Sequence, residues 1–280
     1  MRRSYKYSRN QIPAEANYVE IGRYSTVGTF TFTFEEDAIY GFFVVGGGAS
    51  GMGDYNSAGW GGNGGNGGQA IAFQDIPVSA NTEAVIVVGA GGAGGDSGAN
   101  HAGGDSSVTI NSISYTAQGG LRNSATSPVP NTKVEHSGCG GYPCRGNPLT
   151  EVEAGLIFSG KAGEGDPFPY NNVTRPNTFH SQGGDGLPNP FDENDANLYG
   201  AGGGAGANSY QYSTQQGYIS GGTTGGGTGG GGSNNASTNK GSAATFFGAG
   251  GGGGAFSSNH GNSVGGAGYR GIVIIYKRIN

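Results

Sequence analysis

The chain has 280 residues, of which 63 are glycine and 11 are proline, and its formal net charge is −5. This glycine content suggests disorder, but 34% hydrophobic and 10% aromatic residues with only 12% charged residues are unlike a disordered composition. The glycines keep no every-third register, which excludes collagen. Apolar runs are far shorter than the ~20 residues of a membrane-spanning helix, so we expect no membrane insertion.

The first segment of the chain is basic, whereas the remainder is acidic. Residues 1–23 contain five basic residues against two acidic ones. We interpret residues 1–24 as an N-terminal arm that docks on a larger assembly; a solvated terminus is the alternative. The arm residues that we expect to make this contact are Arg2, Arg3, Lys6 and Arg9. Residues 4–17 are polar and lack the apolar core of a secretory signal, so we expect synthesis in the cytosol.

Several short segments have the pattern of β-strands. Residues 28–34 alternate Thr with Phe, which places Phe30, Phe32 and Phe34 on one face. Apolar, β-branched runs of strand length follow at residues 38–45, 83–88 and 271–276. No segment has the apolar spacing of a helix, so the sequence predicts an all-β protein with little or no α-helix.

A tight hairpin is predicted later in the chain, where residues 108–110 and 113–115 flank Asn111 and Ser112. Because strands occur near both ends, we expect the C-terminal strand to close a sheet that the first strands begin. Residues 25–280 are therefore predicted to form a single domain. Nine of the eleven prolines lie in a segment of different composition at about residues 121–199, which we interpret as an insertion.

The glycine-rich tracts require a physical explanation, because ordering a glycine costs roughly 0.5–1 kcal/mol more than ordering an alanine. Such tracts are stable where a side chain would prevent the backbones from approaching each other. Residues 61–68 repeat glycine with a period of three, which is the period of a polyproline-II helix. We therefore predict a bundle of polyglycine-II helices that hydrogen-bond to one another; flexible linkers are the alternative.

The order of these elements resembles a known family. Apolar strands run into glycine tracts at residues 39–51 and 84–95, and the chain closes with glycine tracts and the apolar strand at 271–276. This arrangement resembles the glycine-rich domain of bacteriophage tail-fibre and virion proteins. It is also similar to the polyglycine-II adhesins of T-even-type long tail fibres and to the glycine-rich region of anaplastic lymphoma kinase-type receptors. The resemblance implies a jelly-roll-like antiparallel β frame with inserted polyglycine-II helices.

Enzyme, cofactor and metal motifs are absent or fail in detail. Gly160 and Lys161 are followed by Ala162, so no phosphate-binding loop is present. The acidic run at residues 192–197 lacks the glycine and the ligand spacing of an EF-hand, and a solvated loop is the favoured interpretation. A glycan hydrolase would need two converging carboxylates, for which no spacing is evident. We expect no catalytic residues, no metal, no cofactor and no nucleic-acid binding.

Surface recognition is the remaining function. Tyrosine and tryptophan offer large contact area with a polar tip, which suits a glycan or protein ligand. Such residues occur between glycine tracts, where loops are expected; the candidate receptor-binding residues are Tyr55, Trp60, Tyr210, Tyr212 and Tyr218. Phe246, Phe247 and Phe256 are instead expected to close the ends of the bundle as a small core.

The resulting hypothesis is a non-enzymatic virion structural protein, a tail-fibre or particle-surface component involved in host attachment. Its expected partners are other virion proteins, contacted through the arm, and a glycan or protein of the host surface. A homotrimer and a single copy are both compatible with the sequence. The alternative hypothesis is a secreted ice-binding or extracellular matrix protein built on the same glycine bundle.

Overall fold

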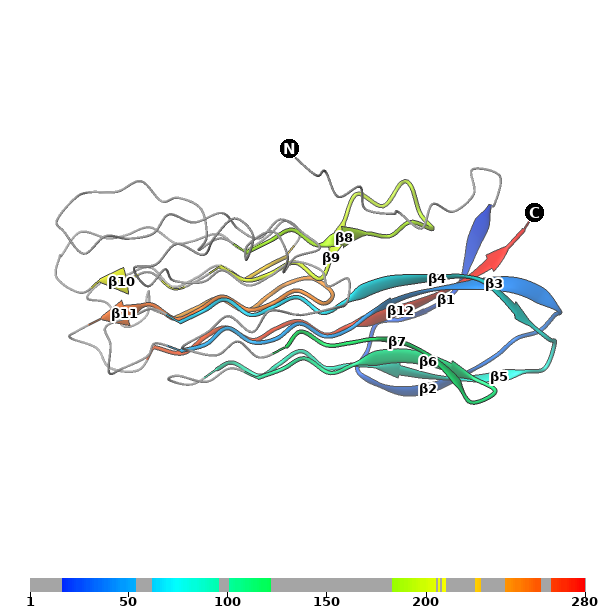
Figure 1. The fold of residues 1–280 in the computed structure, drawn as a ribbon, viewed down its shortest axis with the longest axis horizontal. Coiled ribbons are helices and arrows are strands. Elements are labelled where there is room, and N and C mark those ends of the chain that lie inside the picture. The colour runs from blue at the N-terminus through cyan, green and yellow to red at the C-terminus, as the bar shows by residue number, and fades with distance from the viewer. Residues whose placement is uncertain are drawn as a thin grey trace, which may run out of the picture.

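Two four-stranded antiparallel sheets form one end of the molecule, and glycine-rich segments extend from them to the other end (Figure 1). The computed structural model describes residues 17–53, 62–95, 101–121, 183–204, 206, 208–209, 225–227, 240–257 and 263–279. Sheet A has the order β1 (Tyr18–Tyr24), β12 (Ile272–Arg278), β3 (Ala38–Val45) and β4 (Ala70–Val78). Sheet B has the order β2 (Gly28–Thr33), β5 (Glu83–Val88), β6 (Ser106–Ile110) and β7 (Ile113–Ala117).

The strands with clear apolar patterns form as predicted. β3 and β5 have the predicted bounds, and in β2 the threonines are exposed while Phe30 and Phe32 are half-buried. The hairpin of β6 and β7 turns at Asn111 and Ser112, whose φ angles of 47° and 67° are those of a type I′ turn.

The main core lies between the two sheets. Phe34 is fully buried and packs against the rings of Tyr40 and Phe42, with centroid distances of 4.5 and 6.4 Å. Ile86 of sheet B and Ile275 of sheet A belong to the same buried cluster. Burying each of these side chains contributes about 1.5–3 kcal/mol, so this cluster holds the two sheets together.

The last strand of the chain lies in the middle of sheet A. β12 pairs with β1 on one side and with β3 on the other, which confirms that the C-terminal strand completes a sheet begun near the N-terminus. β1 and β4 are strands that the sequence analysis did not predict. Both are edge strands, and β4 contains Pro77, which is tolerated at an edge.

Glycine-rich segments continue from the strands and hydrogen-bond to one another. Residues 46–53 lie at the centre of this group, which we call the glycine bundle. Gly46, Ala49 and Met52 donate to residues 69, 66 and 63 in turn. The residues between them donate to backbone carbonyls of residues 101–104 and 266–269. Backbone N–H groups of three segments in turn donate to carbonyls of residues 46–53. Hydrogen bonds that repeat after three residues are what a chain with three residues per turn produces.

Glycine is required in the bundle because the backbones approach too closely for a side chain. A Cβ atom at Gly65 would lie 2.2 Å from the carbonyl oxygen of Ala49. A Cβ atom at Gly203 would lie 2.0 Å from the carbonyl oxygen of Gly251. The glycine tracts are therefore packed against each other in the described part of the chain, and the linker interpretation does not hold there.

Buried amide side chains form a row along residues 63–69, the segment that accepts hydrogen bonds from residues 46–52. Asn63, Asn66 and Gln69 are each 1% exposed and recur every third residue. Asn66 Nδ2 donates to the carbonyl of Leu121 over 3.0 Å, and Gln69 Oε1 accepts from the backbone N–H of Gln118 over 2.7 Å. The period of three thus places these amides in a row beside the segment that follows β7.

Four short strands of two residues each lie outside the two main sheets. These are β8 (Leu187–Pro188), β9 (Leu198–Tyr199), β10 (Asn208–Ser209) and β11 (Phe256–Ser257). β8 and β9 are antiparallel, whereas β10 and β11 are parallel. Phe246 and Phe247 pack against a second core cluster, which includes residues of sheet A. Closure of the bundle ends by these residues stays a prediction. The side chain of Phe256 is outside the described part.

The described residues are all-β, with antiparallel main sheets and no helix, as predicted. None of their segments is a helix that could cross a membrane. The jelly-roll connectivity and the polyglycine-II assignment stay predictions. The last residues of the predicted arm form β1, and residues 183–199 of the predicted insertion include β8 and β9.

Candidate functional site

The glycine bundle ends in a common layer far from the sheets. Gly254 donates to Met52 over 2.9 Å, Gly62 donates to Gly254 over 2.6 Å, and Gly206 donates to Gly62 over 2.8 Å. β10 and β11 mark this end of the molecule in Figure 1, and we call it the distal end. Four segments that are separate in the sequence thus reach the same level there.

The candidate recognition residues lie outside the described residues. This applies to all of Tyr55, Trp60, Tyr210, Tyr212 and Tyr218. The structure does place the residues that flank them in the sequence. Gly53 and Gly62 flank the segment that contains Tyr55 and Trp60, and Ser209 immediately precedes Tyr210. These flanking residues belong to the distal end of the bundle.

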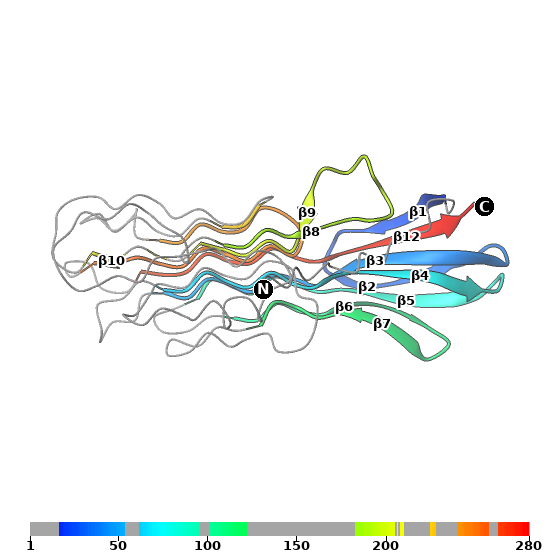
Figure 2. The ribbon, with the colours of Figure 1, turned by 45° about the horizontal axis from the view of Figure 1, so that its top comes forward.

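The first described residue lies at the opposite end of the molecule. Asn17 accepts a hydrogen bond from the backbone of Ile279, and Tyr18 is paired with Arg278. Because β12 runs from the bundle to this end, both described chain ends lie on the side of the sheets away from β10 (Figure 2). The predicted docking residues Arg2, Arg3, Lys6 and Arg9 precede this point and lie outside the described part.

Polar contacts join the two terminal strands, β1 and β12, to Asp75 of β4. Asp75 has a φ of 56° at a bulge of β4, an unusual conformation for a residue with a side chain. Its Oδ1 atom accepts from the hydroxyl of Tyr18 and from Nη1 of Arg278, each over 3.1 Å. A single strained residue therefore holds both the first and the last strand.

A polar loop between β8 and β9 covers the outer face of sheet A. Phe191 anchors it: its ring stacks on Tyr276 with centroids 4.7 Å apart and meets the edge of Tyr18 at 4.9 Å. Gly41 of β3 makes room for the ring, because a Cβ atom there would lie 2.6 Å from Phe191. The slot is thus built by three strands of sheet A.

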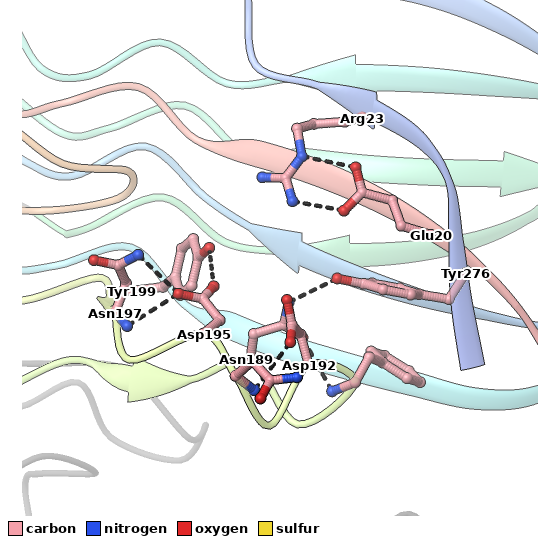
Figure 3. Close-up of polar contacts among 10 residues, drawn as sticks. Glu20, Arg23, Asn189, Asp192, Asp195, Asn197, Tyr199 and Tyr276 are labelled. Carbon is pink, nitrogen blue, oxygen red and sulfur yellow. Dashed lines mark hydrogen bonds and ion pairs between the residues drawn. The ribbon is translucent and has the colours of Figure 1, made fainter. Parts of the chain in front are cut away.

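Carboxylates organise the loop itself (Figure 3). Asp195 Oδ1 accepts from the backbone N–H of Asn197 over 3.0 Å, and its Oδ2 accepts from the hydroxyl of Tyr199 over 2.6 Å. Asp192 Oδ1 accepts from the backbone N–H of Asn194 over 3.0 Å. The loop is therefore a pair of Asx turns with solvent-facing polar side chains.

The hydroxyl groups beneath the loop are shifted toward their neutral form. Burial raises the pKa of Tyr276 to about 12, although the hydrogen bond from Asn189 Nδ2 (2.8 Å) favours the anion and opposes this shift. Burial and the hydrogen bond to Asp195 raise the pKa of Tyr199. For Asp195, burial acts upward, but the hydrogen bonds from Tyr199 and Asn197 outweigh it and lower the pKa.

Glu20 and Arg23 form an ion pair on β1, beside this loop (Figure 3). Arg23 donates through Nε and Nη2 to both carboxylate oxygens, over 2.8 and 2.6 Å. A register shift between Glu20 and Gly22 accompanies this contact. Both side chains are more than a third exposed, so the pair contributes at most about 1 kcal/mol.

This arrangement packs the loop on sheet A through Phe191 and leaves polar side chains of the loop exposed. Among the described residues, no three His, Cys, Asp or Glu side chains come together as metal ligands. The carboxylates of Asp192 and Asp195 are engaged by the loop's own N–H and hydroxyl groups. Glu193 is exposed beside them. The acidic segment is therefore a solvent-facing loop, in agreement with the favoured interpretation of the sequence.

Phe191, Gly41 and Asp75 are key residues that were not predicted from the sequence. The pairing of Phe191 with Gly41 joins residues 150 positions apart, and no local pattern marks it. Asp75 follows Gln74 at the bulge of β4, within a strand that the sequence did not predict.

Comparison with known proteins identifies the class. A family model described as a glycine-rich domain matches residues 25–278, nearly the whole chain. The chain therefore belongs to this family of glycine-rich domains. A comparison with curated proteins found no match.

Proposed function

We propose that this protein is a non-enzymatic structural component of a virion, displayed on a tail fibre or on the particle surface, that contributes to host attachment. The observation that carries the proposal is the two-ended arrangement of the chain. The N-terminal segment enters at one end, at Asn17, and the candidate recognition segments connect to the glycine bundle at the other. A protein that links a particle to a cell needs this polarity.

The glycine bundle supports this role as a rigid spacer. Its hydrogen bonds repeat every three residues and join each inner segment to several neighbours, so we assign it as polyglycine-II helices. Such a bundle carries loops without depending on their sequence, because its contacts are made by backbone atoms. Loops at the distal end can therefore vary while the scaffold is retained.

We assign host contact to the distal segments that contain Tyr55, Trp60, Tyr210, Tyr212 and Tyr218, and docking to the arm. Attachment through the arm would leave the distal end pointing away from the particle. In this proposal the protein is made in the host cytoplasm and is exposed on the assembled virion. Its resemblance to glycine-rich tail-fibre and virion proteins is consistent with this assignment.

Binding of the purified full-length protein to host cells tests the recognition part. We expect Trp60→Ala and the double variant Tyr210→Ala/Tyr212→Ala to reduce cell binding at least about tenfold, as for aromatic hot-spot residues. Tyr5→Ala and Tyr7→Ala, which change tyrosines of the arm, are the matched controls and should bind as the unchanged protein does. Equal binding by all variants would contradict recognition through these residues.

Deletion of residues 1–16 tests the docking part. The deletion ends before β1, so both sheets should remain folded. We expect the shortened protein to keep its thermal stability and cell binding but to be missing from assembled particles. Normal incorporation of the shortened protein would exclude the arm as the docking element.

A further inference from the structure

The outer faces of the two sheets differ in how they are covered. Sheet A is covered by Phe191, Tyr199 and the Phe246–Phe247 pair, which pack on its outer side as a second core cluster. No element of the described residues packs in this way on the outer face of sheet B. Within the described part of the chain, the outer face of sheet B is therefore a bare strand surface.

The bare face consists of short uncharged side chains in register. One row across the four strands contains Thr29, Val87, Ser107 and Thr116. The next row contains Thr31, Val85, Thr109 and Ser114. A charged residue on this face is Glu83, which pairs with Thr33 at the margin. We call the two uncharged rows the hydroxyl face.

We propose that the hydroxyl face packs against the same face of a second copy of this chain. Identical faces can meet only if they bring no like charges together, and these two rows contain none. Thr109 and Ser114 bond to each other within the sheet over 2.6 Å. Because every Thr and Ser hydroxyl can both donate and accept, an inverted copy still supplies partners for the capacity that this bond leaves. Val85, which is 46% exposed, provides an apolar centre.

Sheet twist favours a second sheet over a flat crystalline ligand. Rows of Thr and Ser on a flat sheet would suit an ice surface. Neighbouring strands in a sheet rotate by about 20–25°, so a four-stranded sheet departs from a plane. Two twisted sheets instead pack face to face with their strands inclined by about 30°. The hydroxyl face therefore fits a copy of itself better than a planar lattice.

The size of the face predicts a weak association. Four strands about 4.8 Å apart and five residues long cover roughly 300 Å². A stable interface uses about 800 Å² per partner, so we expect a dissociation constant in the micromolar to millimolar range. This proposal stands apart from the proposed function, since it concerns neither the arm nor the distal end.

Sedimentation velocity of the full chain, at concentrations from about 10 μM to about 1 mM, tests the proposal. We expect concentration-dependent pairing that Val85→Lys weakens at least about tenfold, because it sets two ammonium groups against each other. Thr31→Lys should act in the same way. Val19→Lys is the matched control: Val19 is 44% exposed on β1 of the other sheet, and this variant should pair normally.

Three results would overturn the proposal. One is a chain that stays monomeric up to the highest concentration. Another is equal association of the Val85→Lys, Thr31→Lys and unchanged proteins. The third is reshaping of growing ice crystals by the unchanged protein and not by Val85→Lys, which would make ice the ligand of this face. Circular dichroism of each variant confirms that the sheets remain folded.

Discussion

The ring of Phe191 lies stacked on the ring of Tyr276, with centroids 4.7 Å apart and planes inclined by 21°. Phe191 belongs to the loop between β8 and β9, and Tyr276 belongs to the last strand. The contact joins the loop to a strand that itself pairs with β1 and β3. The attachment of the loop therefore depends on one aromatic ring and on the glycine that makes room for it.

Replacing that glycine should displace the loop. In Gly41→Ala the new methyl group would overlap the ring of Phe191. We therefore expect the free energy of unfolding to fall by about 1–3 kcal/mol, the range for overpacking. Chemical denaturation measures this change. Gly22→Ala is the matched control, because a Cβ atom there lies at an ordinary 3.4 Å or more from its neighbours.

A double-mutant cycle distinguishes this cause from a general strand effect. In the Phe191→Ala background the clash is absent, so Gly41→Ala should cost much less than in the unchanged protein. Equal costs in the two backgrounds would show that the close approach of Gly41 to Phe191 is not what makes the substitution destabilising.

Substitutions in the glycine bundle should have graded effects. Gly203→Ala would place a methyl group 2.0 Å from a backbone oxygen of Gly251, which cannot move away without breaking the bundle. We expect a loss of at least about 3 kcal/mol, comparable to the severe class of core substitutions. Gly104→Ala, with its nearest neighbour at 3.1 Å, should cost less. Thermal unfolding compares them, and equal losses would contradict the packing described.

The turn between β6 and β7 should be improved by glycine. Ser112 has a φ of 67°, a conformation that is strained for serine and free for glycine. Ser112→Gly creates the Asn-Gly pair that type I′ turns favour, so we expect a gain of about 0.4–1 kcal/mol in the free energy of unfolding. Ser112→Val should be destabilising. A loss of stability in Ser112→Gly would show that the serine hydroxyl contributes more than the strain costs.

The sequence predicts the inner strands well because burial on both sides selects apolar residues. β3 and β12 follow this rule, and the bounds of β3 agree with the structure. β5 is buried only at alternate residues, and its run of β-branched residues is what predicts it. β1 departs from the rule. Val19 and Ile21 are 44% and 39% exposed, whereas Tyr18 and Gly22 are half-buried, so the alternation of apolar residues indicates the wrong face.

The loop site depends on contacts that no local pattern reveals. The run at residues 192–197 predicts a polar loop, and its Asx turns follow from local chemistry. Its position on sheet A follows from the fit of Phe191 against Gly41 and Tyr276, which come from distant parts of the chain. Such a fit arises only after the sheet has formed, so the sequence alone does not predict it.

Alkaline pH should destabilise the protein through Tyr276. Its pKa is raised to about 12 in the folded state, against about 10 for an unfolded chain, because burial disfavours the anion. The folded state therefore retains this proton more tightly. The resulting stability, on the order of 2 kcal/mol, is present in full below pH 10 and is lost as the pH rises through about 12.

The absorbance of tyrosinate, followed as the pH is raised, measures this titration, and denaturation at several pH values measures the stability. We expect Tyr276→Phe to remove one group from those that ionise above pH 10 and to flatten the fall in stability between pH 10 and 12. Tyr276→Phe also removes the hydrogen bond between Asn189 Nδ2 and the Tyr276 hydroxyl, which lowers stability at every pH. Comparing the variant with the unchanged protein at neutral pH measures this constant loss, so it can be separated from the dependence of stability on pH. An unchanged slope in Tyr276→Phe would assign the alkaline loss to other groups.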